Sequence, residues 1–451
     1  MTTTPDNLFA VEAERIRQSA PLVVQGRVNQ VVGLVVKCRH FNAPVGALCE
    51  IVPAGRGEPV EAEVIGFDDD ETLVMPLGPM RGIGRGDLVA SLSTRQQVAV
   101  GPGMLGRVLD GRGRPADGEG PLLTTTARPV YGPAPDPLER RRLTDPLSVG
   151  VRAIDGLLTL AKGQRVGIFS GSGVGKSTLL GMIARNTSAD VNVIALVGER
   201  GREVKDFIER DLGEEGLKRS VVVVATSDRP NLMRVHAAFT ATAVAEYFRD
   251  QGADVLLMMD SITRLSMAQR EIGLSAGEPP TTRGYTPSVF AMMPRLLERA
   301  GRTEGGSITG IYNVLVEGDD VNEPIADTAR GILDGHIWLS RDLADRGQYP
   351  AIDALTSVSR LMNDVADDEH KRGARMVSRV LATYRDAEDL INVGAYSPGA
   401  NPEIDLAVRT IAPVREFLMQ GVFERSPWEE TVKRLKALAA EAERPAPAQA
   451  G

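Results

Sequence analysis

The sequence predicts an α/β core built on a mostly parallel sheet, with a small β-barrel before it and a helical domain after it. Between about residues 147 and 365, continuous apolar runs such as RVGIF and DVLLMMD alternate with segments of helical period, as in parallel strands buried on both faces. From Leu22 to about Ser93 the runs are short, β-rich and separated by glycines, which favours a small closed barrel or sandwich. From about residue 370 the pattern is helical.

The N-terminal segment and the connector before the core differ from the predicted domains in residue pattern and composition. Residues 1–20 suit a short amphipathic helix capped by Asp6, whose imperfect apolar stripe either packs on its own domain or docks a partner; we predict docking. Residues 101–146, rich in Gly, Pro and Arg, indicate an irregular connector. The predicted divisions are a docking helix over 1–20, a β-barrel over 21–96, an α/β domain over 97–368 and a helical domain over 369–445.

Composition excludes several classes of protein. The 451 residues include 52 basic and 60 acidic ones, so the net charge of −8 argues against a protein that coats nucleic acid or an anionic membrane. Cys38 and Cys49 have no CxxC spacing, so we expect neither a disulfide framework nor a cysteine metal site, and a reducing cytosol suits the chain. With no run of about 20 apolar residues and no signal-peptide pattern, we expect neither a membrane span nor secretion.

The strongest motif is a glycine-rich turn, SGSGVGKS, between the strand RVGIF and the helical pattern STLLGMIAR. In this setting successive backbone N–H groups and the positive end of the helix converge on phosphate oxygens. Lys176 would reach the β- and γ-phosphates and the Ser177 hydroxyl would bind Mg²⁺, although the first position of the pattern is Ser170 rather than glycine. The residues expected to bind the nucleotide are Gly171, Ser172, Gly173, Val174, Gly175, Lys176, Ser177 and Thr178.

Two carboxylates follow buried strands of the predicted sheet. Asp260 closes DVLLMMD and would hold the Mg²⁺ shell directly or through water. Glu199 follows VNVIALVG, so it would emerge at the same carboxyl edge of the sheet and could orient the water that attacks ATP. The stretch from Glu199 to Glu203, which includes Arg200, could instead be a solvated charge run, and the residues alone favour that interpretation.

Longer motifs resemble the catalytic ATPases of flagellar and type III protein export, which are relatives of the rotary ATP synthase subunits. The resemblance covers about residues 20–440 and rests on motifs that include LGRVLDGRGRP, GSGVGKS, VGERGREVKDFIE, MDSITRLSMAQREIGLSAGEPPTTRGYTPSVF and QYPAIDALTSVSR. It implies a P-loop (RecA-like) nucleotide-binding core. It also implies that Glu199 polarises the lytic water, with Arg200 as its neighbour in the same catalytic motif.

Other positions gain a role only through the resemblance. Tyr349, in GQYPAID, matches the aromatic residue that stacks on the adenine ring, and Tyr396, in VGAYSPG, could form the other side of that slot. Arg360, in SVSR, matches an arginine finger that reaches the γ-phosphate bound to a neighbouring subunit. The loop 279–288 resembles the segment that faces the central pore of the family's hexamer, with Thr286 where proline is more usual.

The resemblance further implies an ATP hydrolase that works as a homohexamer and energises protein export. Its cofactors would be ATP and Mg²⁺, and its place would be the cytoplasm, at the inner face of the cytoplasmic membrane. The implied partners are a stator-like regulatory protein at the N-terminus, a central stalk protein, membrane proteins of the export gate and chaperone-bound export substrates, with no specific nucleic acid. The motif LINVGAY is more similar to its flagellar form, so we expect the flagellar system, with the injectisome as the alternative.

Two other classes of protein share part of this pattern. A non-catalytic nucleotide-binding subunit of a rotary ATPase keeps the P-loop but typically lacks the carboxylate at the Glu199 position. A Rho-type RNA translocase needs RNA-stacking aromatic residues in its barrel, where this chain has only Phe41 and Phe67. Both classes are therefore disfavoured.

Overall fold

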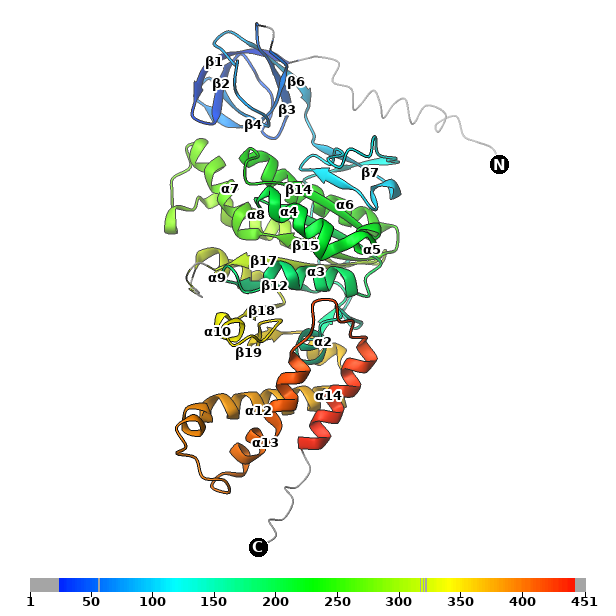
Figure 1. Ribbon diagram of the computed structural model, residues 1–451. Coiled ribbons are helices and arrows are strands. Elements are labelled where there is room, and N and C mark those ends of the chain that lie inside the picture. Colours follow the sequence, from blue (N-terminus) through cyan, green and yellow to red (C-terminus); the bar gives the residue numbers. More distant parts are fainter. Residues whose placement is uncertain (1–23, 56, 317, 319, 321–322, 443–451) are drawn as a thin grey trace, which may run out of the picture. The chain divides into compact units, whose positions relative to one another are not determined.

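The computed structural model describes residues 24–55, 57–316, 318, 320 and 323–442 (Figure 1). The docking helix predicted over residues 1–20 lies outside this part of the chain. The chain forms two compact units: one contains the barrel through Gln97 with residues 229–233 and 268–287, and the other contains the remainder of the chain.

The N-terminal barrel is closed and antiparallel, with the strand order β1-β2-β5-β4-β3-β6. It confirms the predicted β-domain and decides between the barrel and the sandwich. Its interior contains Cys38 and Cys49 as free, fully buried thiols, and burial raises the pKa of Cys38 to about 12. The strands are β1 (Gln25–Val32), β2 (Val35–Arg39), β3 (Leu48–Val52), β4 (Val60–Asp68), β5 (Glu71–Pro76) and β6 (Leu88–Ser93).

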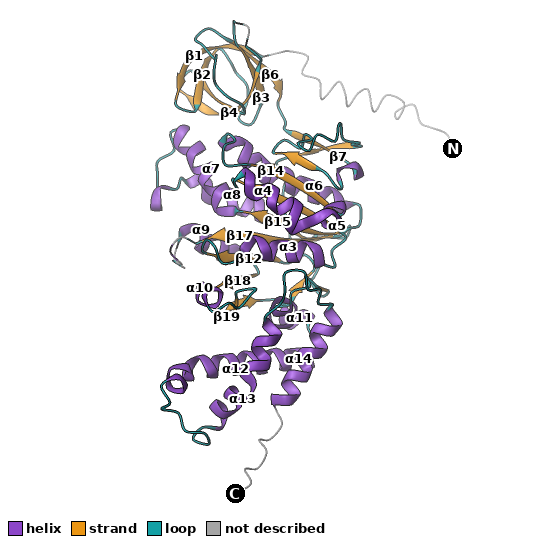
Figure 2. Cartoon of the chain, viewed as in Figure 1, coloured by secondary structure: helices purple, strands orange, loops and turns teal. Residues whose placement is uncertain are grey.

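The α/β core contains a nine-stranded sheet in the order β19-β18-β12-β17-β15-β13-β14-β8, with β16 paired to β17 off this path (Figure 2). Along this order the neighbours are parallel except for β18 and β19. Two strands, β17 and β15, therefore lie between β12 and β13. The strands are β8 (Val108–Asp110), β12 (Arg165–Ser170), β13 (Val191–Val197), β14 (Ser220–Ala225), β15 (Asp254–Asp260), β16 (Gly301–Arg302), β17 (Ser307–Leu315), β18 (Gly335–Leu339) and β19 (Ile352–Ser359).

Helices follow most of these strands, as the alternating sequence pattern predicts. Leu179 and Ile183 of α3 belong to one buried cluster with strand residues such as Met258, so this helix packs its apolar side on the sheet. The helices of the core are α2 (Arg152–Leu157), α3 (Lys176–Asn186), α4 (Gly201–Asp206), the π-helical η3 (Phe207–Leu212), α5 (Gly213–Lys218), α6 (Asn231–Asp250), α7 (Ile262–Ser275), α8 (Pro287–Leu297), α9 (Pro324–Ile332), α10 (Arg341–Asp345) and α11 (Met362–Val365).

The connector over 101–146 is less irregular than its composition predicts. Its strand β8 joins the edge of the main sheet, where Val108 pairs in parallel with Val222. Strand β9 (Thr126–Pro129) pairs with β7 (Gln97–Val100). These strands are only three or four residues long, and runs of that length carry too little periodicity to be recognised in a sequence rich in glycine and proline.

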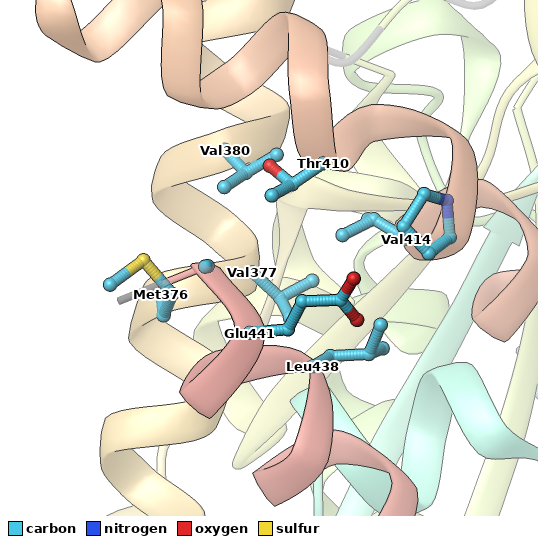
Figure 3. A pocket seen from close by; sticks show the side chains of 9 residues that line it. Met376, Val377, Val380, Thr410, Val414, Leu438 and Glu441 are labelled. Carbon is cyan, nitrogen blue, oxygen red and sulfur yellow. The ribbon is translucent and has the colours of Figure 1, made fainter. Parts of the chain in front are cut away.

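The C-terminal domain consists of α12 (Asp368–Asn392), α13 (Pro402–Leu418) and α14 (Trp428–Ala442). Asp367 caps α12 by accepting a hydrogen bond from the His370 N–H at 2.7 Å, and Asn401 caps α13 with proline as its first residue. A cavity of about 10 Å³ lies among the three helices, lined by residues such as Val377, Val414 and Leu438 (Figure 3). A cavity of that size can hold one water at most, so it is a packing gap rather than a ligand site.

These helices are tied to the core through α2. The buried Arg152 donates from Nε to the carbonyl of Phe417 at 2.8 Å, and its backbone N–H donates to Gln420 Oε1 at 2.9 Å. The His370 ring bonds the Gly156 carbonyl at 2.8 Å. Among the described residues, none of the helices is long and apolar enough to cross a membrane.

A buried ion pair fixes the connector to the core. Arg299, which is fully buried after α8, donates from Nε and Nη2 to the two carboxylate oxygens of Glu246 in α6, both at 2.7 Å. Its Nη1 donates to the backbone carbonyl of Val130 at 2.6 Å. The guanidinium therefore links two helices and the connector through hydrogen bonds that satisfy a charge removed from water.

We expect Glu246→Ala to lower the free energy of unfolding by about 3 kcal/mol or more, because it leaves the Arg299 charge buried and uncompensated. The double variant Glu246→Leu/Arg299→Met should recover much of this loss, because it removes both charges. Urea denaturation followed by circular dichroism measures both effects. Glu215→Ala, in the exposed pair with Lys218, is the control and should leave the midpoint unchanged; an equal shift in this control would contradict the role of burial.

Candidate functional site

The predicted phosphate loop joins the end of β12 to the start of α3. Gly173 and Gly175 have φ values of 81° and 88°, which glycine adopts without strain. A side chain built on Gly173 would meet no atom within 4 Å, so the turn faces open space. The loop leads into α3 at Lys176, with Gly175 as the N-cap. It is therefore a concave turn of backbone N–H groups at the positive end of a helix, the arrangement that binds phosphate.

The structure brings Lys176, Asp260 and Glu199 together, as the strand pattern predicts. The Lys176 ammonium donates to Asp260 Oδ1 at 2.5 Å and lies 3.7 Å from Glu199 Oε1. Asp260 is the last residue of β15, and Glu199 follows β13. Only 4% of Asp260 and 7% of Glu199 is exposed to solvent. The two carboxylates and the lysine thus form a buried cluster at the carboxyl edge of the sheet.

Burial controls the electrostatics of this cluster. The removal of Asp260 from water raises the pKa of its carboxyl above the usual value, because the charged form is poorly solvated. The Lys176 ammonium opposes this rise, the Glu199 charge adds to it, and the amide of Asn313 opposes it by donating to Asp260. The carboxylate therefore depends on nearby positive charge to stay ionised, and the start of α3 supplies it.

Two residues of this cluster were not predicted from the sequence. Arg264, in the first turn of α7, donates from Nε to Glu199 Oε1 at 3.1 Å. A side chain at Gly198 would lie 2.9 Å from the Arg264 Cβ, so glycine permits this approach. Asn313, in β17, donates from Nδ2 to Asp260 Oδ1 at 3.0 Å. A sequence signal exists only for Arg264, which stands four residues after Asp260 at a predicted strand–helix junction.

The remaining predicted residues lie outside the cluster, and Arg360 lies at the opposite edge of the sheet, where Ser359 pairs with Gly335. Arg200 is the N-cap of α4, and its exposed side chain lies 3.3 Å from Glu203. Thr178 is in the first turn of α3. Arg360 follows β19 and is exposed, with its backbone N–H bonded to the Asp334 carbonyl at 3.1 Å.

An aromatic surface borders the phosphate loop. The ring of Tyr349, which is 46% exposed, would lie 3.4 Å from a side chain built on Gly175. The Tyr349 carbonyl accepts a hydrogen bond from the Gln420 N–H at 2.9 Å, which brings the loop after α13 to this place. That loop contains Phe423, whose ring is 73% exposed and stacks with the Arg185 guanidinium of α3 at 4.9 Å. The Phe423 ring thus packs on the last turn of α3, at the end of that helix away from the phosphate loop.

Tyr396 lies in the loop between α12 and α13. Its hydroxyl donates to Asp405 Oδ1 at 2.8 Å, a contact within the C-terminal domain. Its assignment to the adenine slot stays a prediction from the resemblance.

Comparisons with known proteins identify the family of each part of the chain. Residues 150–359 match the nucleotide-binding domain of the ATP synthase alpha/beta family, residues 28–92 match the β-barrel domain of that family, and residues 366–437 match the T3SS EscN ATPase C-terminal domain. The flagellum-specific ATP synthase of Bacillus subtilis is 54% identical over 416 residues, which is 92% of this chain and 94% of the relative. The type 3 secretion system ATPase of Xanthomonas euvesicatoria is 50% identical over 425 residues, which is 94% of this chain and 96% of the relative.

Solved structures give the same result. The assembled ATPase EscN from the type III secretion system of enteropathogenic E. coli superposes with a TM-score of 0.88 at 46% identity, covering 92% of this chain and 100% of that chain. EscN in complex with its central stalk EscO superposes with a TM-score of 0.85 at 45% identity and the same coverage. The phosphate loop, the buried carboxylates and these matches over most of the chain place it plainly: it belongs to the flagellar and type III protein-export ATPases of the ATP synthase alpha/beta family.

Proposed function

We propose that this ATPase hydrolyses Mg-ATP at the Lys176 cluster and thereby energises the export of flagellar proteins. The observation that carries the proposal is one ammonium group shared between two buried carboxylates directly below a phosphate-binding loop. When a nucleotide binds, the ammonium can move from the carboxylates to the phosphates. The carboxylates are then available to hold a cation and to orient a water.

The oxygen donors of the site fit a magnesium nucleotide. Ser177 presents a hydroxyl at the exposed start of α3 and Asp260 presents a carboxylate, both of which suit Mg²⁺. Within the described residues, no group of three or more His, Cys, Asp or Glu side chains could hold a metal ion, so most ligands here would come from phosphates and water. When bound, Mg²⁺ would neutralise charge on the phosphates.

Each side chain has a separate task in the proposed mechanism. The loop N–H groups and Lys176 bind the phosphates and stabilise the charge that develops on them. Glu199 orients the attacking water by accepting a hydrogen bond from it. Arg264 fixes the Glu199 carboxylate by donating from Nε to its Oε1. Tyr349 supplies one wall of the base slot, because its half-exposed ring lies beside Gly175 of the loop.

We further propose that the chain works as a homohexamer around a central stalk. EscN, a structural relative, was solved as an assembled ATPase and with its central stalk EscO. Arg360 is exposed, which suits a finger offered to a neighbouring subunit. The loop 279–288 is assigned to the pore; within it the Thr281 hydroxyl donates to the Tyr285 carbonyl at 2.7 Å, which gives the loop internal support.

The remaining proposals concern the export apparatus. Relatives at 54% and 50% identity serve as a flagellum-specific ATP synthase and a type 3 secretion system ATPase, so the flagellar assignment, with the injectisome as its alternative, rests on LINVGAY. We propose that residues 1–20 bind a stator-like regulatory protein. The ring would work at the export gate on the inner face of the membrane, where it receives chaperone-bound substrates. No specific nucleic acid is assigned.

Replacing Glu199 separates binding from hydrolysis. Glu199→Gln should bind Mg-ATP with nearly unchanged affinity and turn over about 10²-fold more slowly or worse, because the amide cannot act as a base. Calorimetric titration and phosphate release measure the two quantities. Glu209→Gln, an exposed neighbour in η3, is the control and should behave as the unsubstituted chain. Full activity in Glu199→Gln would remove Glu199 from the mechanism.

Tyr349→Ala should raise the KM for ATP by about 5-fold or more with a smaller change in kcat, because base stacking is worth about 1–3 kcal/mol. Tyr349→Phe keeps the aromatic face and should stay within twofold of the unsubstituted chain. Steady-state kinetics on the three proteins checks this, and an equal loss in Tyr349→Phe would show that the hydroxyl, rather than the ring, matters.

The finger assignment predicts complementation between inactive variants. Arg360→Ala should bind ATP but hydrolyse it about 10³-fold more slowly, and Lys176→Ala should fail through loss of the phosphate contact. Mixed rings contain interfaces where an intact P-loop faces an intact Arg360, so mixing should restore phosphate release that neither variant shows alone. Specific activity should also rise with protein concentration as rings form. Constant activity on dilution with no rescue would exclude an interface site.

A further inference from the structure

Asn313 lies in the centre of the sheet, beside the phosphate site, on a strand that no motif of the site includes. Strand β17 runs between β12 and β15, and Asn313 pairs in register with Ile168 of the P-loop strand. The residue is completely buried. Its Nδ2 donates to Asp260 Oδ1 at 3.0 Å, the same oxygen that accepts the Lys176 ammonium at 2.5 Å. One carboxylate oxygen therefore receives a charged and an uncharged donor.

The other half of the Asn313 amide is unsatisfied. Its Oδ1 is buried and has no hydrogen-bond partner. A buried acceptor without a donor is destabilising, so such an atom in a functional site calls for an explanation. It sits on a side chain bonded to Asp260, the carboxylate assigned to the cation, and a bound water of that site would satisfy it.

The arrival of nucleotide changes what holds Asp260. Lys176 is now 2.5 Å from the carboxylate, and to bind phosphates its ammonium must leave that oxygen. The Asn313 donor cannot follow, since it stands on a short side chain in the middle of a sheet. After the lysine moves, Asn313 is the donor that remains on Asp260 Oδ1. This hydrogen bond keeps Asp260 Oδ2 directed away from Asn313.

We propose that Asn313 is a positioning residue for the cation half of the site. It fixes the orientation of Asp260 when Lys176 transfers to the phosphates, and its free Oδ1 accepts a hydrogen bond from a water of the cation shell. The inference rests on the proposed Mg-ATPase function. Asn313 should therefore strengthen the binding of ATP when Mg²⁺ is present and leave the binding of ATP without Mg²⁺ unchanged.

The test compares ATP binding with and without the cation. The full chain is titrated calorimetrically with ATP in excess MgCl₂ and with ATP in EDTA. The Kd in EDTA divided by the Kd in MgCl₂ measures how much Mg²⁺ strengthens ATP binding. In Asn313→Leu, the ratio should fall about 10-fold or more, the usual effect of removing a residue that orients a metal ligand. The Kd in EDTA should stay within about twofold. Asn313→Ala removes the same amide with a smaller side chain and should lower the ratio equally. It replaces the leucine variant in the measurement if that variant does not fold.

Asn192 provides a matched control. It is also a fully buried asparagine of this sheet with an unpartnered Oδ1, but its Nδ2 donates to the Ala184 carbonyl at 2.9 Å, away from Asp260. Asn192→Leu should lower stability and leave the ratio unchanged. An unchanged ratio in the Asn313 variants, or an equal fall in Asn192→Leu, would overturn the proposal. An unsubstituted chain whose ATP binding gains nothing from Mg²⁺ would overturn the proposed function as well, which separates the two failures.

Discussion

The Lys176 ammonium is shared by two carboxylates that lie almost completely out of water, and the surrounding core holds the three groups together. The charges come from the end of β15, the residues after β13 and the start of α3. In a low-dielectric surrounding, separating these groups by even a few ångströms would be costly. Strand order, the glycine turn and the seating of α3 on the sheet therefore depend on one another. The cluster also carries one more negative charge than positive, before the Arg264 contact with Glu199 is counted.

Sequence reasoning succeeded where the chemistry follows from local pattern and sheet geometry. The P-loop has its own spacing, and the meeting of Glu199 and Asp260 follows because the ends of parallel strands lie at one edge. The catalytic role of Glu199 came only from the family resemblance, since the residues alone favour a solvated charge run. Asn313 could not be found in this way. It lies within the apolar run SITGIYNVLV, where it reads as another core position, and it meets Asp260 only because β17 and β15 are neighbours. Nothing local in the sequence predicts that pairing, just as nothing local predicts that β1 closes the barrel on β6.

The segment between β18 and β19 connects the phosphate loop with the C-terminal helices. At its start, Arg341 donates to the Ser172 carbonyl in the P-loop at 3.2 Å. Farther along, Arg346 bonds Glu388 of α12 at 2.8 Å, and Tyr349 follows beside Gly175. The nine-residue stretch from Arg341 to Tyr349 thus contacts the nucleotide loop on one side and the helical domain on the other. A displacement of the loop by nucleotide would therefore reach α12 through direct contacts, with no need for a long pathway.

The loop after α13 limits how this protein can be recombined with its relatives. Gln420 bonds the carbonyls of Gly150 and Tyr349, and Arg185 of α3 donates to the Val422 carbonyl. Arg152 adds its own bond to Phe417. A chimaera cut at the start of α12 would look clean on a domain diagram, yet all these bonds cross the cut. Those of Arg152 with Phe417, Arg185 with Val422 and Gln420 with Gly150 join residues more than 200 positions apart in the chain. The natural unit of exchange is the helical domain together with the side chains of α2 and α3 that hydrogen-bond to it, and grafts that ignore this should lose the bonds of Arg152, Arg185 and Gln420.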